Sequence, residues 1–371
     1  MENYKKKILR FLRNFSWYLD YTFFNFLPRK EASQTFRRIL IIELDKIGDI
    51  LMITPTLRSL SLFYHTKVDV MVQPSMRDVL LHNPYVDKIL PYGRQEIQNN
   101  YSEIVQRLQG KYDLAVLLHP GSRVVSKLLK DIKTEYRVGV TRPGFFDGKG
   151  HFLHKKNKPN FSVQHKIRDN LDVITTTLGI VPANDFYELF TSSDAEKSVE
   201  AILLSEKIKQ PFILIHAAPE YLSHQWNSEK FAKLADYLTV GGYFVVFSGS
   251  QKDIPINDEI ISFMKNNVCN LAGTTTIQQF FALIKKSCLV VSVDTSAMHI
   301  AAALHVPVVA LFGEGDPKIW GPYSENSKVI FKEKEMCKSC SKWFGADRVK
   351  HGCMDIIRVE EVLEAVHSLL K

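Results

Sequence analysis

The sequence alternates short apolar runs with amphipathic stretches, and this pattern occurs twice along the chain. In the first half the apolar runs are Ile39–Leu44, Val68–Val72, Lys88–Pro91, Asp113–His119 and Tyr136–Val140. In the second half they are Phe212–His216, Tyr243–Phe247, Leu289–Val293 and Val306–Phe312. Strands that are covered by helices on both faces have such continuous apolar runs, with helical patterns between them. The chain is therefore predicted to form two doubly wound parallel α/β sheets in tandem.

The length and the breaks in the pattern indicate where these two units divide. A chain of 371 residues fits two domains of about 150–200 residues each. The stretch from Gly144 to Lys166 has no period and predicts a loop or lid, and the helical pattern that follows ends before Gly179 and Pro182. We expect a first domain over residues 36–185 and a second over residues 195–371, facing each other across a cleft. The last helix is a candidate to pack back on the first domain.

The net charge of +8 is concentrated at the N-terminus. Residues 1–30 carry seven basic and two acidic residues, which leaves only +3 for the rest of the chain. A basic groove for nucleic acid is therefore not required, and we expect no nucleic-acid partner. The same thirty residues have Ile8, Leu12, Phe15 and Leu19 at helical spacing among basic residues. This pattern indicates an interfacial helix on a membrane surface, or alternatively a helix packed on the protein itself.

The N-terminal segment is too often interrupted by charges to span a membrane or to serve as a secretory signal. The five cysteines, an odd number without such a signal, predict reduced thiols in the cytoplasm. Cys337 and Cys340 form a C-x-x-C pair, and Cys353 follows. These three thiols are candidate ligands for Zn or Fe, with reduced loop cysteines as the alternative.

The first apolar run leads into a loop that contains Asp45, Lys46, Gly48 and Asp49. A helix is predicted directly after the loop, so Asp49 lies at the carboxyl edge of the sheet, where parallel α/β sheets bind ligands. Its carboxylate is a candidate catalytic group, and the alternative is that it only caps the helix. Asp45 and Lys46 are placed to line the cleft or to pair with each other.

Two loops of the second half are predicted to border the same cleft. Strand Leu289–Val293 leads into Asp294, Thr295 and Ser296 and a helix of small residues that carries Ala297 and His299. Free N–H groups and hydroxyls at such a helix start suit a phosphate, and the alternative for the histidine is a place in the core.

The other loop, from Ala217 to Gln225, includes His224 and precedes Trp226, which is expected to be a packing residue. Near these loops, the glycine-rich turn at Gly313 is either a plain connection or a wrap around a nucleotide.

Together these segments resemble glycosyltransferase family 9, the family of the lipopolysaccharide heptosyltransferases. The resemblance rests on four blocks in order: ILIIELDKIGDILMITPTLRSL, AAP…HQWNSEKFAKLA, NLAGTTTIQQFFALI and VSVDTSAMHIAAALHVPVVALFG. It implies a GT-B-type fold of two facing Rossmann-like domains, with the acceptor on the first and the nucleotide sugar on the second. It also implies inverting transfer of a heptose or related sugar from an ADP-activated donor to a lipopolysaccharide-core or other envelope saccharide. No cofactor is implied beyond the candidate metal.

The resemblance also implies roles for individual residues. Asp49 matches the catalytic base, and the D-T-S-A-M-H run at Asp294 to His299 matches the diphosphate-binding segment. Two positions depart from the family pattern. Ser296 stands where a glycine is frequent, and His224 replaces the usual lysine two residues before the tryptophan. Stabilisation of the leaving group is then expected either to be weaker or to be taken over by Lys46, Lys318 or a metal ion, and the donor is open to differ from ADP-heptose.

Two other functions fit parts of the pattern. A dinucleotide-dependent oxidoreductase is disfavoured because no G-x-G-x-x-G follows the first strand. A sugar-nucleotide-binding protein that has lost catalysis is the alternative that His224 and Ser296 leave open, and the presence of Asp49 argues against it. The expected location is the cytoplasmic face of the inner membrane.

Overall fold

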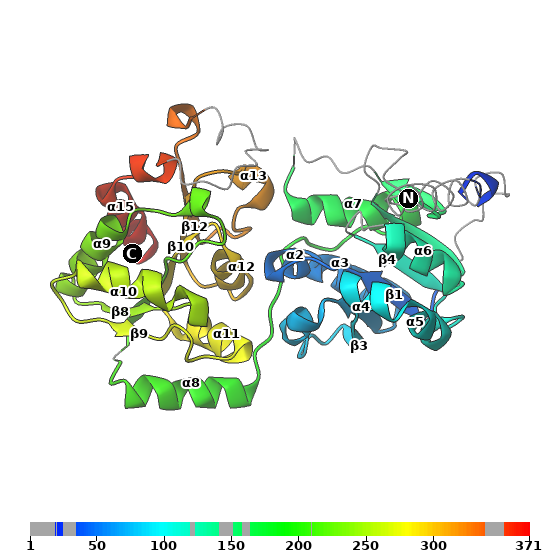
Figure 1. Ribbon diagram of the computed structural model, residues 1–371, viewed down its shortest axis with the longest axis horizontal. Coiled ribbons are helices and arrows are strands. Elements are labelled where there is room, and N and C mark those ends of the chain that lie inside the picture. The colour runs from blue at the N-terminus through cyan, green and yellow to red at the C-terminus, as the bar shows by residue number, and fades with distance from the viewer. Residues whose placement is uncertain are drawn as a thin grey trace, which may run out of the picture.

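The protein consists of two domains, each built on a six-stranded parallel sheet (Figure 1). The computed structural model describes residues 19, 21–24, 35–118, 123–140, 151–157, 164–208, 210–337 and 352–371. The first sheet has the order β3-β2-β1-β4-β5-β6 and the second the order β12-β11-β10-β7-β8-β9. Within each domain the order is the same, with the topological switch point beside the first strand. The predicted tandem of parallel sheets is confirmed.

The strands of the first sheet are β1 (Ile39–Ile42), β2 (Val68–Val72), β3 (Val86–Pro91), β4 (Leu114–Leu117), β5 (Tyr136–Val140) and β6 (Lys155–Asn157). Those of the second are β7 (Phe212–His216), β8 (Phe244–Phe247), β9 (Cys269–Asn270), β10 (Leu289–Val293), β11 (Val308–Phe312) and β12 (Ser327–Phe331). All nine predicted strands form. The sequence missed β6, β9 and β12, because these strands are short or partly exposed and need no continuous apolar run.

Helices cover both faces of the sheets. The first domain carries α2 (Ile47–Met52), α3 (Thr54–Tyr64), α4 (Arg94–Asn99), α5 (Tyr101–Leu108), α6 (Arg123–Asp131) and α7 (Lys166–Leu178). The second carries α8 (Ser193–Ser205), α9 (Ser228–Val240), α10 (Ile254–Ser262), α11 (Ile277–Lys286), α12 (Ser296–Ala303), α13 (Pro317–Trp320) and α15 (Val359–Leu369). The helix expected after Asp49 is divided into α2 and α3, because Pro55 lacks an N–H donor and fits only the first turn of a helix.

Side-chain caps begin two of the helices, and a glycine ends a third. The Asn227 side chain accepts from the N–H of Lys230 at the start of α9, and Thr276 forms a capping box at the start of α11. Gly179 ends α7 with a φ of 73°, in the left-handed region that glycine adopts readily. Most of the predicted loop between Gly144 and Lys166 lies outside the described residues.

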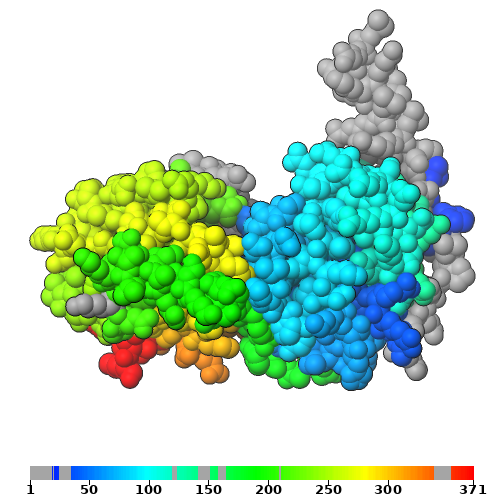
Figure 2. Space-filling model, turned by 90° about the horizontal axis from the view of Figure 1, so that it is seen from below, coloured from blue at the N-terminus to red at the C-terminus, as the bar shows by residue number. Residues whose placement is uncertain are grey.

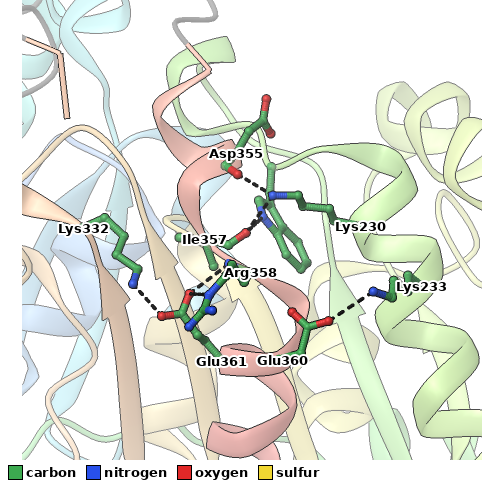
Figure 3. Close-up of polar contacts among 9 residues, drawn as sticks. Lys230, Lys233, Lys332, Asp355, Ile357, Arg358, Glu360 and Glu361 are labelled. Carbon is green, nitrogen blue, oxygen red and sulfur yellow. Dashed lines mark hydrogen bonds and ion pairs between the residues drawn. The ribbon is translucent and has the colours of Figure 1, made fainter. Parts of the chain in front are cut away.

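The C-terminal segment is anchored on the second domain by side chains of α9 and by Trp226, which lies just before it (Figure 3). Trp226 is fully buried, and its Nε1 donates to the carbonyl oxygen of Ile357 at 3.1 Å. Lys230 Nζ donates to the same oxygen at 3.0 Å and to the carbonyl of Asp355. The expectation that the last helix packs back on the first domain is wrong, because α15 packs against α9, β11 and β12. Its buried Val359, Val362 and Val366 belong to the core of the second domain.

Lys230→Met is expected to lower the free energy of unfolding by about 1–3 kcal/mol, because it leaves the Asp355 carbonyl without its donor and the Ile357 carbonyl with that of Trp226 alone. Chemical denaturation followed by circular dichroism measures the change. Lys233→Met is the matched control one turn along the same helix, since Lys233 forms an exposed pair with Glu360 at 3.1 Å. If both variants unfold at the same denaturant concentration as the wild type, the anchor is not a stabilising contact.

Few residues of the N-terminal segment lie in the described part of the chain. Tyr21 is buried, stacks on His151 with ring centroids 3.7 Å apart, and accepts from Lys156 Nζ at 3.0 Å. Leu19 and Phe23 are exposed. This short piece therefore packs on the first domain and also presents apolar side chains to solvent. Within the described ranges, no helix has the length and apolar character needed to cross a bilayer.

The two domains meet along one side of each body (Figure 2). Helix α2 of the first domain faces α12 of the second at this junction (Figure 1). The apolar core is continuous across it, with Ile50 and Leu51 in the same cluster as Met298 and Ala301. The loops that follow β1, β7 and β10 are thereby brought to one place.

Candidate active site

Asp49 lies in the first turn of α2, at the carboxyl end of β1. Its Oδ2 accepts from the N–H of Lys46 at 3.4 Å, so the carboxylate does cap the helix, although the bond is long. The residue is only partly buried, and capping occupies one side of one oxygen. The capping role and a chemical role are therefore compatible.

A buried carboxyl group lies beside this loop and was not predicted. Glu43 is 1% exposed, and its Oε1 accepts from the N–H of Asp45 at 3.1 Å. Burial, together with the charges of Asp49 and Asp45, raises the pKa of Glu43 well above its usual range, and buried Lys166 opposes this shift. In the sequence, only one feature could have indicated this buried group: Glu43 is the single charged residue in the apolar run I-L-I-I-E-L.

The start of α12 provides the second half of the site. Thr295 is the N-cap, and its hydroxyl lies 3.4 Å from the N–H of Ala297 and 3.0 Å from the hydroxyl of Ser292. Asp294, Thr295 and Ser296 are partly exposed, whereas Ala297 is buried. A helix start with N–H groups near the surface is a favourable place for a phosphate.

Asp294 is the most perturbed carboxylate at this helix start. Burial raises its pKa to about 6, although His224 and Lys46 act in the opposite direction. His224 Nδ1 lies 3.7 Å from Asp294 Oδ2, beyond hydrogen-bond distance, and has no hydrogen-bond partner among the described residues. Gly315 has a φ of 109°, and a β-carbon on it would lie 3.6 Å from the same Asp294 oxygen. The glycine-rich turn after β11 therefore lies over Asp294.

His299 connects the two halves. Its ring is so close to Gly48 that a β-carbon there would lie 2.8 Å from His299 Cδ2, and it also meets the ring of Tyr187 edge-on. Burial lowers the pKa of His299 to about 3, which keeps the imidazole neutral. Its Nδ1 is buried without a hydrogen-bond partner in the described part of the chain, which differs from a core histidine satisfied by a carbonyl.

Lys46 reaches from the first domain to the second. Its Nζ donates to Glu220 Oε1 at 2.5 Å and to the Tyr221 hydroxyl at 3.0 Å. Burial works against the charged form of Lys46, but these two bonds outweigh it and raise its pKa. Asp45 does not pair with Lys46 as one prediction had it; its Oδ1 accepts from Arg94 at 3.0 Å. The sequence did not single out Glu220 or Tyr221 within the loop after β7.

Three predicted donor residues have little or no free surface. Ala217 and Ala297 are fully buried in the core. Gly313 is buried against Met354 and the carbonyl of Ser223, since a β-carbon on it would lie 2.6 Å from Met354 Sδ. Of the candidate metal ligands, Cys340 lies outside the described residues, and the N–H of Cys337 donates to Cys353 Sγ at 3.3 Å. The described residues hold no cluster of three potential metal ligands. Metal binding by the cysteines stays a prediction, to be checked by elemental analysis of the purified protein.

Asp294→Asn is expected to stabilise the protein at pH 8 by up to about 3 kcal/mol. The pKa of Asp294 is about 6 in the folded chain, above its ordinary value near 3.8, so folding favours the protonated form. The free-energy cost of burying the Asp294 charge is absent below pH 3.8, grows as the pH rises from 3.8 to about 6, and is complete above pH 6. Urea denaturation at pH 8 and pH 5 measures the effect, and the gain should be roughly halved at pH 5. An equal gain at both values would contradict the assignment.

Comparisons with known proteins show the family and the fold of the chain. The family model of glycosyltransferase family 9 (heptosyltransferase) matches residues 102–344. Lipopolysaccharide heptosyltransferase 3 of Escherichia coli K12 is 28% identical over 339 residues, which cover 87% of this chain and 95% of the relative.

Two solved structures share the fold. A family 9 glycosyltransferase from Veillonella parvula has a TM-score of 0.79 at 22% identity and covers 92% of this chain and 99% of its own. The ADP-heptose heptosyltransferase II of Escherichia coli has a TM-score of 0.73 at 23% identity, with 90% and 98% covered. The GT-B-type fold is thereby confirmed. The chain belongs to glycosyltransferase family 9 and is a glycosyltransferase.

Proposed function

We propose that the protein transfers a heptose, or a closely related sugar, from an ADP-activated donor to a saccharide of the lipopolysaccharide core. The curated relatives that match it at about 28% identity are named lipopolysaccharide or lipooligosaccharide heptosyltransferases. We further propose that the acceptor binds to the first domain, residues 36–185, and the donor to the second, residues 195–371. The enzyme would work at the cytoplasmic face of the inner membrane, where a lipid-linked acceptor is held.

One observation carries this proposal: the start of α2, which contains Asp49, lies directly against the start of α12. The contact of Gly48 with His299 joins these two helices from different domains, and the bond from Lys46 to Glu220 joins the loops that follow β1 and β7. A carboxylate on one side and a phosphate-binding helix start on the other match the two needs of glycosyl transfer. An acceptor hydroxyl requires a base, and a nucleoside diphosphate requires stabilisation as it departs.

The proposed reaction is a single displacement that inverts the anomeric centre. The acceptor hydroxyl oxygen attacks the anomeric carbon of the donor sugar while Asp49 takes the hydroxyl proton. The bond from that carbon to the phosphate oxygen breaks, and the nucleoside diphosphate leaves with the electron pair. Glu43 lies beside Asp49, and burial together with the charge of Asp49 raises the pKa of Glu43, so that Glu43 favours its uncharged form beside the charged Asp49.

On the donor side, the N–H groups at the start of α12 and the hydroxyl of Ser296 are proposed to hold the diphosphate. Lys46 is proposed to replace the lysine that the family usually has at the position of His224, because it is placed near Asp294 from across the junction. The neutral His299 is proposed to set the approach of the two loops and, through its Nδ1, to contact the donor. No cofactor enters this scheme.

A direct assay tests the proposal. The purified protein is incubated with ADP-heptose and a heptose-deficient lipopolysaccharide core, and the product is analysed by mass spectrometry for the mass of one added heptose. A thermal-shift screen with ADP-, UDP- and GDP-sugars tests donor binding separately, since a bound donor raises the melting temperature. Failure of all three classes to bind would refute the whole proposal. Binding without transfer or donor hydrolysis would support a catalytically inactive binding protein instead.

A further inference from the structure

The first domain contains a basic pocket at the edge of its sheet away from the second domain. The pocket has a volume of about 670 Å³ and lies at the amino ends of β1 and β2, between Ile39 and Asp69. Asp49 lies at the carboxyl end of β1, so the pocket and the candidate active site are on opposite edges of the same sheet. The pocket is lined by six basic and two acidic side chains, a formal charge of +4.

The acidic side chains in and beside the pocket already form hydrogen bonds or ion pairs with other residues. Asp69 accepts from the Tyr112 hydroxyl at 2.8 Å and from the N–H of Lys88 at 3.1 Å. Asp87 lies 3.8 Å from Lys88 Nζ. Asp113, just outside the pocket, pairs with Arg38. Within the described part of the chain, none of these carboxylates forms an ion pair with another basic side chain of the pocket.

Four basic side chains of the pocket therefore have no ion-pair partner among the described residues. One of them, Arg107, lies over the ring of Tyr92, 6.0 Å from its centroid, which leaves three others. Arg37, Lys67 and Lys111 are exposed, and none of them forms an ion pair within the described ranges. Gathering like charges in one pocket is unfavourable unless an anion is bound there. The charge thus points to an anionic ligand at this edge.

Exposed apolar side chains beside the pocket favour a membrane as the source of that anion. Leu62 and Phe63, in the last turn of α3, are 55% and 51% exposed, and the chain passes from them through Thr66 to Lys67 in the pocket wall. The Thr66 hydroxyl donates to the carbonyl of Arg37 at 3.1 Å, which holds the two sides together. Cations next to apolar side chains suit a bilayer interface, where headgroup phosphates lie beside acyl chains.

The position of the pocket in the chain supports the same ligand. The first described residues of the domain body, in dark blue, lie at the end of the molecule away from the second domain (Figure 2). In the sequence they follow a segment with seven basic and two acidic residues in thirty. We propose that the pocket of Arg37, Lys67 and Lys111, with Leu62 and Phe63, docks the protein on a membrane by binding the phosphates of anionic phospholipid headgroups.

This docking rests on the proposed membrane acceptor, but it assigns the contact to the folded body and not only to the N-terminal segment. It also orients the enzyme. The strand β1 spans four residues, about 13 Å at 3.3 Å each, so the active site would stand at least that far from the lipid surface. The acceptor saccharide would then project from the membrane past the first domain to reach Asp49.

The test measures the partition of the full chain onto vesicles by sedimentation. Vesicles of 30% phosphatidylglycerol in phosphatidylcholine are compared with pure phosphatidylcholine, for the wild type and for Arg37→Gln/Lys67→Gln/Lys111→Gln. About tenfold or more weaker partition onto the anionic vesicles is expected for the triple variant, since each basic residue near the surface contributes several-fold. Lys252→Gln/Lys265→Gln/Lys328→Gln is the control, because it removes the same charge from exposed sites on the second domain.

Three results would overturn the proposal. An unchanged triple variant would assign the membrane contact to the N-terminal segment, and an equal loss in the control would assign it to net charge. Displacement of the wild type from vesicles by 5 mM inorganic phosphate, but not by equal ionic strength of chloride, would identify a soluble anion as the ligand. Sugar transfer to a lipid-free core oligosaccharide should be unchanged in the triple variant, so failure of docking and failure of the proposed reaction are distinguishable.

Discussion

Asp49→Asn is expected to lower the kcat of sugar transfer by about 10²- to 10⁴-fold while the dissociation constant of the donor stays within about twofold. An amide cannot take the proton of the acceptor hydroxyl, so the attacking oxygen loses its base. The donor is proposed to bind on the other domain, and its affinity should not depend on this group. Steady-state kinetics with a saturating acceptor and thermal-shift titration of the donor measure the two quantities.

Asparagine is chosen because it separates catalysis from helix capping. The Oδ1 of Asn can still accept from the N–H of Lys46, so this bond can be kept, and the lost charge in the first turn of α2 should cost at most about 1 kcal/mol. Asp45→Asn is the matched control in the same loop, because Asp45 pairs with Arg94 and is given no role in the reaction. If Asp49→Asn transfers sugar at the rate of the wild type, Asp49 is a helix cap only.

The sequence predicts the fold well where a structural element depends on residues that are close together in the chain. Continuous runs of Val, Ile and Leu become buried parallel strands, and the helix that was expected to end before Gly179 does end there. Asp49 could be placed at the sheet edge for the same reason, because a strand, a loop and a helix start follow each other directly. In each case the deciding interactions are local in the chain.

The parts that the sequence could not predict depend on contacts between distant segments. Glu43 belongs to the site only because the fold buries it near Lys166, more than a hundred residues away. Glu220 gains its importance from Lys46, which is 174 residues away in the chain. The last helix carries no signal for one partner over another, because its valines would suit either domain. The spacing of residues in the sequence cannot show which of two distant segments a residue or a helix will contact.

The same limit applies to the positive charge on the donor side. From the sequence, Lys46, Lys318 and a metal were equal candidates to replace the lysine missing at His224. The structure favours Lys46, because its Nζ donates to Glu220 and its charge acts on Asp294. Lys318 is exposed, and among the described residues its side chain has no hydrogen-bond partner, since the bond to Asp316 comes from its backbone N–H. A cation from the first domain would also tie donor binding to the approach of the two domains.

Lys46→Met is therefore expected to lower kcat/KM for the donor by about 10²-fold, because it removes a charge that stabilises the leaving diphosphate. The double variant Lys46→Met/His224→Lys should recover at least tenfold, since it returns a cation to the second domain next to Asp294. Methionine keeps much of the length of the lysine side chain, so packing against Tyr221 is largely preserved.

Glu220→Gln distinguishes this charge role from a simple link between the domains. It weakens the ion pair of Lys46 with the second domain but leaves the cation free to meet the donor. If Lys46 serves the diphosphate, Glu220→Gln should keep the wild-type kcat/KM or exceed it, whereas Lys46→Met should not. If the pair acts only by holding the domains together, both variants should lose activity equally and His224→Lys should rescue neither. The three variants together thus decide whether Lys46 of the first domain takes over the role of the lysine that the family usually has at the position of His224.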